Sequence, residues 1–255
     1  MESTGVRTER PTDGVLLITL DRPRKRNAID GAMSRAVAAA LDDLDADPTL
    51  AVGVLTGAGG TFCSGMDLRA FLDGDAPEVP GRGFGGLTQA PPAKPLIAAV
   101  EGFALAGGCE LVLACDLVVA SSEAVFGLPE VGIGLIAGSG GLLRLPHRVP
   151  RAVATELALT GDRFSAVDAH GWGLVNRLVD PGSAVSAATE LAERIARNAP
   201  LALAATKRML AAADLPVDEA WARQEAELVA IKATGDAQEG ARAFAEKRAP
   251  RWSGR

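Results

Sequence analysis

Two glutamates stand among apolar residues and could transfer protons. Glu110 is followed by Leu-Val-Leu-Ala, and Glu130 is preceded by Phe-Gly-Leu-Pro. Burial in such surroundings disfavours the charged carboxylate, so it would raise the pKa of the group and suit it to acid or base chemistry near neutral pH. A solvated residue in the first turn of a helix, stabilised by the helix dipole, explains Glu110 equally well. The two residues alone therefore leave both interpretations open.

Two glycine-bearing turns could supply hydrogen-bond donors to a substrate carbonyl. The segment Phe62–Leu68 follows a predicted strand that ends at Thr56, and Ala106–Glu110 follows one that ends near Val100. A turn that leads into a helix presents unpaired backbone N–H groups, where the helix dipole favours negative charge. Two such donors converging on one carbonyl would form an oxyanion hole. Each motif by itself is better explained as a tight turn that needs glycine for its backbone shape.

Other familiar catalytic patterns are incomplete in this chain. Residues 132–137, Gly-Ile-Gly-Leu-Ile-Ala, match a loose dinucleotide-binding motif, but they do not follow an N-terminal strand and lack the acidic partner about 20 positions on. Ser139 lacks the first glycine of the nucleophile-elbow motif. The two histidines, His147 and His170, form no recognisable triad with it. A dinucleotide site or a serine hydrolase is therefore not supported.

The three cysteines, Cys63, Cys109 and Cys115, lack the C-x-x-C spacing of a zinc or redox site. An odd number of cysteines without that spacing is typical of reduced thiols, which pack as small core residues. We therefore expect no structural metal and a cytoplasmic location.

Short apolar runs that alternate with amphipathic segments predict the elements that would position these residues. Strands are expected at residues 15–20, 51–56, 96–100 and 116–120. A helix is expected over residues 29–44, because apolar residues fall on one face and Asp30 can cap it, and another over residues 107–114. Alternating strands and helices indicate an α/β core.

The rest of the chain contains a loop and then a helical region. Residues 73–92 are rich in Gly and Pro and are expected to form a mobile surface loop beside a pocket. After an apolar run at residues 175–179, helices are expected at residues 184–197, 201–213, 217–233 and 237–247. These patterns predict a core over residues 1–183 and a helical C-terminal region over residues 184–255.

Composition argues against several classes of protein. The chain has 255 residues, 48% of them hydrophobic, so it can bury one sizeable core. Its net charge of −6 opposes binding to nucleic acid, which needs cations to offset phosphate charge. Residues 1–14 contain no apolar signal segment, and Glu101, Glu110 and Asp116 interrupt the longest apolar stretches, so we expect no membrane span.

A series of motifs runs in order along nearly the whole chain. They are Arg22-Pro23 with Asn27-Ala28, Phe62 to Leu68, Ala106 to Glu110, Pro129-Glu130 with Gly134 to Gly141, Arg144-Leu145-Pro146, Thr160-Gly161, Gly173-Leu174-Val175, and Glu239-Gly240 with Phe244 to Pro250. Together they resemble the crotonase (enoyl-CoA hydratase/isomerase) superfamily. The resemblance implies a spiral of β-β-α turns that forms two sheets, followed by a helical region that assembles a homotrimer or a dimer of trimers.

Carried over position by position, the resemblance implies an acyl-CoA site. The N–H groups of Met66 and Gly107 would form the oxyanion hole for the thioester oxygen. Glu110 would activate a water molecule, and Glu130 would deliver a proton to the α-carbon. Coenzyme A would be part of the substrate, and neither a metal nor a redox cofactor is implied. The CoA-binding residues would be Arg26, Ala28, Ser64, Asp67, Phe244 and Lys247.

Two groups of residues are the expected contacts for CoA. One is the basic run at residues 22–26. The other is the pair Phe244 and Lys247, which would share one helical face at positions i and i+3 and could come from a neighbouring subunit. Two departures from the family pattern are Met66, in place of a smaller residue, and Ala106, in place of the first of three glycines. Because Met66 keeps its N–H group, its side chain bears on acyl preference rather than on mechanism.

Three functions follow from the resemblance. The first is hydration of a 2-enoyl-CoA to a 3-hydroxyacyl-CoA, which the presence of both glutamates favours. The second is Δ3-Δ2 enoyl-CoA isomerisation, in which Glu130 alone would move a proton between carbons. The third is a non-catalytic member that binds acyl-CoA or RNA, and the negative net charge weakens the RNA version. The length and shape of the acyl group stay open.

Overall fold

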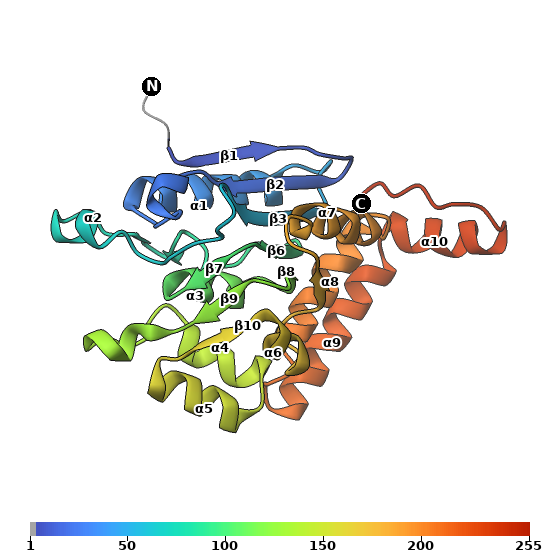
Figure 1. The fold of residues 1–255 in the computed structure, drawn as a ribbon. Helices are drawn as coiled ribbons and strands as arrows, with labels where there is room; N and C mark the ends of the chain where they lie inside the picture. Colours follow the sequence, from blue (N-terminus) through green and yellow to red (C-terminus); the bar gives the residue numbers. More distant parts are fainter. Residues whose placement is uncertain (1–3) are drawn as a thin grey trace.

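Strands joined by helices form the centre of the structure, a computed structural model that describes residues 4–255 (Figure 1). The strands are β1 (Val6–Glu9), β2 (Val15–Leu20), β3 (Val52–Gly57), β4 (Glu78–Val79), β5 (Gly83–Phe84), β6 (Leu96–Val100), β7 (Phe103–Leu105), β8 (Leu117–Ser121), β9 (Val125–Gly127), β10 (Arg163–Ser165) and β11 (Arg177–Val179). The helices are α1 (Gly31–Ala46), α2 (Leu68–Leu72), α3 (Gly107–Ala114), α4 (Gly141–Arg148), α5 (Arg151–Thr160), α6 (Ala166–Gly171), α7 (Ala184–Ala196), α8 (Pro200–Ala211), α9 (Val217–Lys232) and α10 (Gly235–Ala245), with 3-10 turns η1 (Pro23–Lys25) and η2 (Pro129–Ile133).

The largest sheet has the strand order β1-β2-β3-β6-β8-β11, and every pair except β1–β2 is parallel. Its central strands are buried on both faces, which explains their continuous apolar sequences. Successive side chains point to opposite faces. Leu16 and Ile18 therefore pack with α1 on one face, while Val15 and Leu17 share the other face with α7.

A second layer is built from short segments that follow the long strands. Strands β10, β9 and β7 form a three-stranded sheet, and single-residue parallel bridges pair Cys63 with Ala104 and Ile29 with Met66. Each long strand is therefore followed by a short extended piece, as in β6-β7-α3. This repetition is the predicted spiral of β-β-α turns, and it brings the segments around residues 29, 66 and 106 side by side.

The main predicted elements are confirmed with small shifts at their ends. The structure contains the predicted strands as β2, β3, β6 and β8, and α3 spans residues 107–114 as predicted. In α1 the Asp30 side chain accepts a hydrogen bond from the Met33 N–H group, so Asp30 is the N-cap. The sequence analysis did not identify β7, β9 and β10, because strands of three residues are too short to show alternation.

The expectation of a surface loop over residues 73–92 is wrong for its second half. The segment contains the β4–β5 hairpin, and the Phe84 and Leu87 side chains are buried in the main core. Its glycines permit this close packing, because a Cβ atom on Gly86 would lie 2.2 Å from the Ser34 carbonyl oxygen. A Gly-rich composition therefore reflects close backbone approach here rather than a segment lying on the surface.

The first and last C-terminal helices differ in how they lie relative to the large sheet. Ala184, Ala188 and Ala192 of α7 pack against the sheet, whereas α10 projects away from it at the right of Figure 1. Because α7 shares a core with β2 and β3, the boundary between a core at 1–183 and a helical region at 184–255 stays a prediction. Among residues 4–255, no helix is long and apolar enough to cross a membrane.

Candidate active site

Helix α3 begins at a strained turn that presents its first amide. Ala106, the residue before the helix, has φ 51° and ψ −127°, a conformation that glycine adopts far more readily than alanine. Hydrogen bonds hold it there, because its N–H group donates to the Gly127 carbonyl and its own carbonyl accepts from Cys109 and Glu110. Gly107 is the first residue of the helix, so its N–H group has no partner within the helix.

The bridge to Ile29 fixes the direction of the Met66 N–H group. The Ile29 N–H group donates to the Gly65 carbonyl, and the Asp67 N–H group donates to the Ile29 carbonyl, both at 2.8 Å. The residues flanking Met66 therefore bond toward Ile29. Since successive amides in an extended segment point to opposite sides, the Met66 N–H group points away from Ile29.

The two turns lie against each other. A Cβ atom on Gly65 would lie 2.9 Å from the Ala106 Cβ atom and 3.3 Å from the Gly107 nitrogen, so only glycine fits at position 65. Within residues 4–255, neither the Met66 nor the Gly107 N–H group donates a hydrogen bond. Two free donors side by side can polarise one carbonyl oxygen.

Glu110, on the first turn of α3, is buried and fixed by two backbone amides. Its Oε1 atom accepts hydrogen bonds from the N–H groups of Ser139, at 2.7 Å, and Gly141, at 2.9 Å. Burial raises the pKa of this carboxyl above its usual value, while the two amides and the nearby Arg144 guanidinium act in the opposite direction. The two amides therefore fix the position of Oε1.

Glu130, in η2, is buried with an oxygen that nothing satisfies. Its Oε2 atom is inaccessible and has no hydrogen-bond partner within the described residues. Burial raises the pKa of this carboxyl, and the charge of Glu110 raises it further. The structure therefore brings the two glutamates within electrostatic reach of each other. An unpartnered carboxyl of raised pKa is suited to carry a proton.

The four residues predicted to bind CoA near the N-terminal half lie around the Met66 turn. Arg26 is exposed, and its carbonyl accepts a hydrogen bond from the Ser64 N–H group at 3.0 Å. Ala28 is buried beside Arg22, to which its carbonyl is bonded. Asp67 is also buried and is an acceptor for cations of this protein, so its carboxylate is not free to bind a ligand cation.

Phe244 and Lys247 do not share a helical face, so that expectation is wrong. Helix α10 ends at Ala245, and Lys247 follows the C-cap with φ 53°, in the left-handed region. The Phe244 side chain is 88% exposed. Figure 1 also places α10 on the opposite side of the fold from α2, which follows Met66. Within one chain these two residues therefore lie far from the Met66 turn.

Several residues that shape the site were not predicted. The amides of Ser139 and Gly141 bind Glu110, and the Phe84 ring lies where a side chain on Gly107 would otherwise fit, 2.5 Å from such a Cβ atom. Arg144 donates from Nη2 to the Thr88 carbonyl at 2.6 Å and so joins α4 to the segment that carries Phe84. The Gly138–Gly141 run was the one available signal, because it resembles a helix-start turn.

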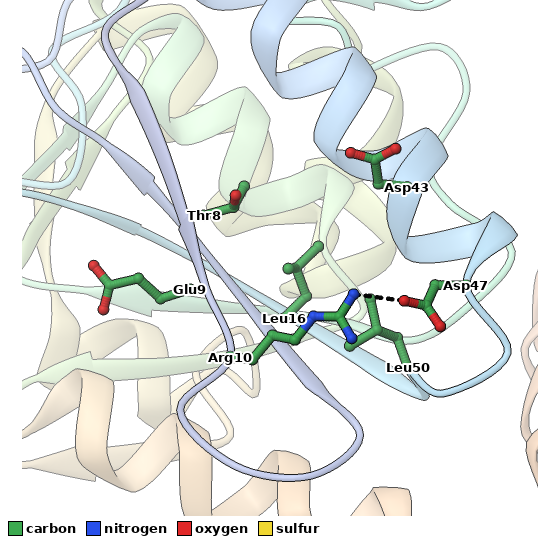
Figure 2. A pocket seen from close by; sticks show the side chains of 7 residues that line it. All are labelled: Thr8, Glu9, Arg10, Leu16, Asp43, Asp47 and Leu50. Atoms are coloured by element: carbon green, nitrogen blue, oxygen red, sulfur yellow. Dashed lines mark hydrogen bonds and ion pairs between the residues drawn. The ribbon is translucent and has the colours of Figure 1, made fainter.

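A separate cavity of about 300 Å³ lies beside β1, away from these residues (Figure 2). Its lining consists of Thr8, Glu9, Arg10, Leu16, Asp43, Asp47 and Leu50. The Arg10 guanidinium is paired with Asp47 across it. None of the predicted site residues lines this cavity, so it is not the candidate site.

Comparison with known proteins places this geometry in context. A family model described as enoyl-CoA hydratase/isomerase matches residues 10–255. The chain is 45% identical over 251 residues to a carnitinyl-CoA dehydratase of Salmonella typhi, with 94% of this chain and 95% of the relative covered.

Solved structures agree with the chain over almost its whole length. An enoyl-CoA hydratase from Mycobacterium marinum is 56% identical with a TM-score of 0.96, and one from Mycobacterium tuberculosis is 54% identical with a TM-score of 0.97. Each comparison covers 99% of this chain and 100% of the other.

Proposed function

Because this chain belongs to the enoyl-CoA hydratase/isomerase family and is a lyase that acts on CoA thioesters, we propose that it adds water reversibly to a 2-enoyl-CoA. The product is a 3-hydroxyacyl-CoA. The observation that carries the proposal is the pairing of two glutamates in different surroundings. Glu110 is held by two amides, and Glu130 has a buried oxygen without a hydrogen-bond partner among residues 4–255.

In the proposed mechanism, the N–H groups of Met66 and Gly107 bind the thioester oxygen. They stabilise the negative charge that develops there as water attacks the β-carbon. Glu110, whose Oε1 atom accepts two amide hydrogen bonds, is the carboxylate that takes a proton from the water. Glu130, whose raised pKa favours its neutral form, gives a proton to the α-carbon.

A Δ3-Δ2 isomerase would need one glutamate to move a proton, and Glu110 would have no role in it. The fixed and buried state of Glu110 favours the hydratase, because burying a carboxylate costs folding free energy that a residue without a catalytic role would not justify. The same argument opposes a binding protein without catalysis, since such a protein would keep two buried carboxyls at a cost.

The test compares Glu110→Gln, Glu130→Gln and the surface control Glu156→Gln. We expect Glu110→Gln to abolish hydration and to spare slow exchange of the α-proton, while Glu130→Gln damages both. Removing a general acid or base lowers the rate by about 10²–10⁴-fold. Hydration of crotonyl-CoA, isomerisation of a 3-enoyl-CoA and deuterium incorporation from solvent are measured for each protein. A wild-type protein that isomerises but hydrates no enoyl-CoA would reject the hydratase.

The acyl group is the open part of the proposal. Relatives include an enzyme named carnitinyl-CoA dehydratase as well as enzymes named enoyl-CoA hydratases, and dehydration is hydration run in reverse. Exposed apolar side chains near the site, such as Leu68 and Phe71 of α2, support an uncharged acyl group. A panel of straight-chain and branched enoyl-CoA esters, together with carnitinyl-CoA, would decide between the two by their kcat/KM values.

We further propose that the protein assembles as a homotrimer or a dimer of trimers and that CoA lies between subunits. The separation of α10 from the Met66 turn within one chain supports a site completed by Phe244 and Lys247 of a neighbouring copy. Arg26, Ala28 and Ser64 would contact CoA from the subunit that supplies the glutamates. The three buried thiols support the proposed cytoplasmic location, because reduced cysteines are typical of that compartment.

A further inference from the structure

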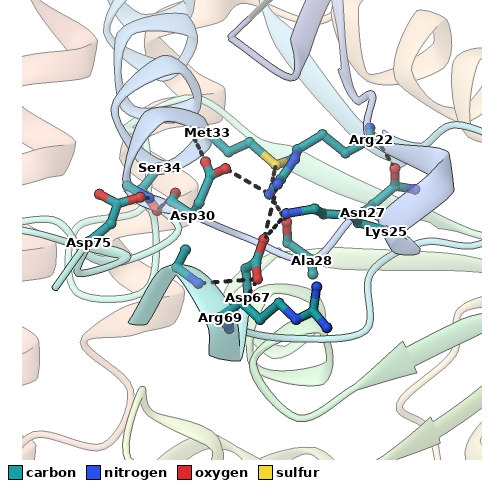
Figure 3. Close-up of polar contacts among 12 residues, drawn as sticks. Arg22, Lys25, Asn27, Ala28, Asp30, Met33, Ser34, Asp67, Arg69 and Asp75 are labelled. Atoms are coloured by element: carbon teal, nitrogen blue, oxygen red, sulfur yellow. Dashed lines mark hydrogen bonds and ion pairs between the residues drawn. The ribbon is translucent and has the colours of Figure 1, made fainter. Parts of the chain in front are cut away.

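The guanidinium of Arg22 is enclosed by acceptors from two segments (Figure 3). Its Nη1 atom lies 2.8 Å from the Ala28 carbonyl oxygen and 2.7 Å from an Asp30 carboxylate oxygen. Its Nη2 atom lies 3.0 Å from Asp67. The Arg22 side chain is 19% exposed, so its positive charge pairs with carboxylates of the protein and is not available to a ligand.

These acceptors flank the bridge that aims the Met66 amide. Ala28 and Asp30 stand on either side of Ile29, and Asp67 directly follows Met66. At the bridge itself the two pieces are joined by backbone hydrogen bonds between Ile29 and its partners Gly65 and Asp67, and a third bond joins the Ser64 N–H group to the Arg26 carbonyl. The planar, multiply donating guanidinium therefore fastens one piece to the other across the bridge.

The Arg22 end of this connection is itself held firmly. The Arg22 N–H group donates to Asn27 Oδ1 at 2.9 Å, and the fully buried Asn27 amide donates to the carbonyls of Ala58 and Thr61. The aliphatic part of Arg22 packs under Gly5, where a Cβ atom would lie 2.9 Å from Arg22 Cδ. Because the backbone and aliphatic part of Arg22 are fixed, its guanidinium can hold residues 28–30 at a set distance from Asp67.

We propose that Arg22 is a positioning residue for the oxyanion hole, holding the Met66 N–H group in line with that of Gly107. The inference rests on the proposed function, because only that function requires the two amides to bind one thioester oxygen. It also reassigns Arg22, which the sequence analysis placed among the cations for CoA.

Lys25 provides a matched comparison. Its ammonium group also binds Asp67, at 2.9 Å, but its side chain is 53% exposed and is bonded to neither Ala28 nor Asp30. The Lys25 carbonyl accepts a hydrogen bond from the Ala28 N–H group, but the Lys25 side chain reaches Asp67 alone, through an exposed ammonium group. Replacing Lys25 removes a charge from the same group and leaves the connection across the bridge in place.

The experiment measures polarisation of a bound thioester directly. Butyryl-CoA labelled with ¹³C at the carbonyl cannot be hydrated, and its carbonyl stretch in difference infrared spectra reports the hydrogen bonds to its oxygen. We compare the wild type with Arg22→Gln, Arg22→Lys and Lys25→Gln, and measure Tm and kcat and KM for hydration of crotonyl-CoA in parallel.

We expect Arg22→Gln to lose most of the downward shift of the carbonyl stretch and to lower kcat more than KM. A displacement of about 1 Å in a catalytic group can cost 10²-fold in rate. Arg22→Lys should recover part of the shift, because an ammonium group can meet one of the two carboxylates. Lys25 lies in the basic run predicted to contact CoA, so Lys25→Gln can raise KM, but it should keep all of the carbonyl shift. If Arg22→Gln does not fold, the comparison of Arg22→Lys with Lys25→Gln still decides the matter.

Two outcomes would overturn the inference. A lower Tm for Arg22→Gln and Arg22→Lys with an unchanged carbonyl shift would make Arg22 a purely structural residue. An absence of any shift in the wild type would remove the oxyanion hole that Arg22 is said to position. Failure of the proposed function gives a different result: the wild type would polarise butyryl-CoA but hydrate no enoyl-CoA, and the effect of Arg22 on the shift would remain.

Discussion

At the scale of single residues, the two glutamates differ in how the protein solvates them. Glu110 receives two backbone N–H groups, which compensate part of the cost of burying its charge. Glu130 has an inaccessible oxygen that accepts no hydrogen bond from the part of the chain that the structure describes, and the charge of Glu110 lies close enough to oppose its ionisation. The two amides therefore favour the charged form of Glu110, whereas burial and the charge of Glu110 favour the neutral form of Glu130. This difference supports the proposed division between a base and an acid.

The raised pKa of Glu130 predicts a pH-dependent effect on stability. In the unfolded chain the carboxyl ionises near its usual pKa of 4.5, whereas the fold resists ionisation, so stability is lost as the pH rises through that value and up to the raised pKa. Glu130→Gln removes this loss. We expect its Tm to exceed that of the wild type at pH 8 and the difference to shrink as the pH falls toward 4.5. Calorimetry at several pH values, with Glu156→Gln as control, would refute the idea by showing a constant difference.

Ala106 predicts a stabilising substitution. Its φ of 51° with ψ −127° is strained for any residue with a Cβ atom, and such strain costs roughly 1–3 kcal/mol. Ala106→Gly removes the strain but adds freedom to the unfolded chain, so we expect a net gain of about 1 kcal/mol. Urea denaturation measures it, and Ala39→Gly, on the exposed face of α1, should lose about 1 kcal/mol instead. Equal losses in both variants would contradict the strain argument.

At the scale of elements, α3 can lie where it does only because its first two residues are glycines. A Cβ atom on Gly107 would lie 2.5 Å from the Phe84 ring, and one on Gly108 would lie 2.2 Å from the Cys63 carbonyl oxygen. The helix start therefore packs directly on the backbone of the segment that leads to Met66. This contact, together with the Ile29–Met66 bridge, sets the spacing between the two amides of the proposed oxyanion hole.

Gly108→Ala tests this contact. The carbonyl of Cys63 accepts a hydrogen bond from the Leu105 N–H group, so it cannot move freely, and α3 must shift instead. Overpacking of this kind costs about 1–3 kcal/mol, and we expect kcat to fall as well because the Gly107 amide moves with the helix. Gly171→Ala in α6 is the matched control, since a Cβ atom there meets nothing within 4 Å. Unchanged Tm and kcat for Gly108→Ala would show that the contact is loose.

At the scale of the whole molecule, large apolar side chains are exposed on α4 and on the C-terminal helices. Leu143 of α4, Leu210 of α8 and Trp221 of α9 are each more than half exposed. A cavity of about 770 Å³ lies between α4 and α8, with Leu143 and Leu210 in its lining. Exposed apolar surface of this kind is typical of contacts between subunits, which supports the proposed trimer or dimer of trimers.

Assembly predicts complementation between two defective subunits. Lys247→Ala alone should raise KM for a CoA ester more than for a pantetheine ester, which lacks the nucleotide, and Glu110→Gln alone should be inactive. If Lys247 serves the site of a neighbouring subunit, mixed assemblies contain sites with an intact glutamate and a neighbour's intact lysine. We expect unfolding and refolding the two variants together to restore a fraction of sites with the wild-type KM. Light scattering checks the assembly, and a stable monomer at micromolar concentration would contradict it.

Much of the scaffold could be predicted from local patterns. The buried strands β2, β3 and β6 have continuous apolar sequences, and α1 shows a one-sided apolar face with Asp30 as a cap, because these signals depend only on neighbours in the chain. The order of motifs indicated the family, and through it the roles proposed for Met66, Gly107 and the two glutamates.

The tertiary structure decided what depends on residues far apart in the chain. The run of cations at residues 22–26 is typical of an exposed basic patch, yet Asp67, 45 positions after Arg22, turns Arg22 inward. Bridges of a single residue, such as Ile29 with Met66, have no periodicity that a sequence could display. The amides that bind Glu110 likewise come from residues 139 and 141. Such pairings form only when the β-β-α turns stack, because each needs the backbone of one turn to meet that of the next.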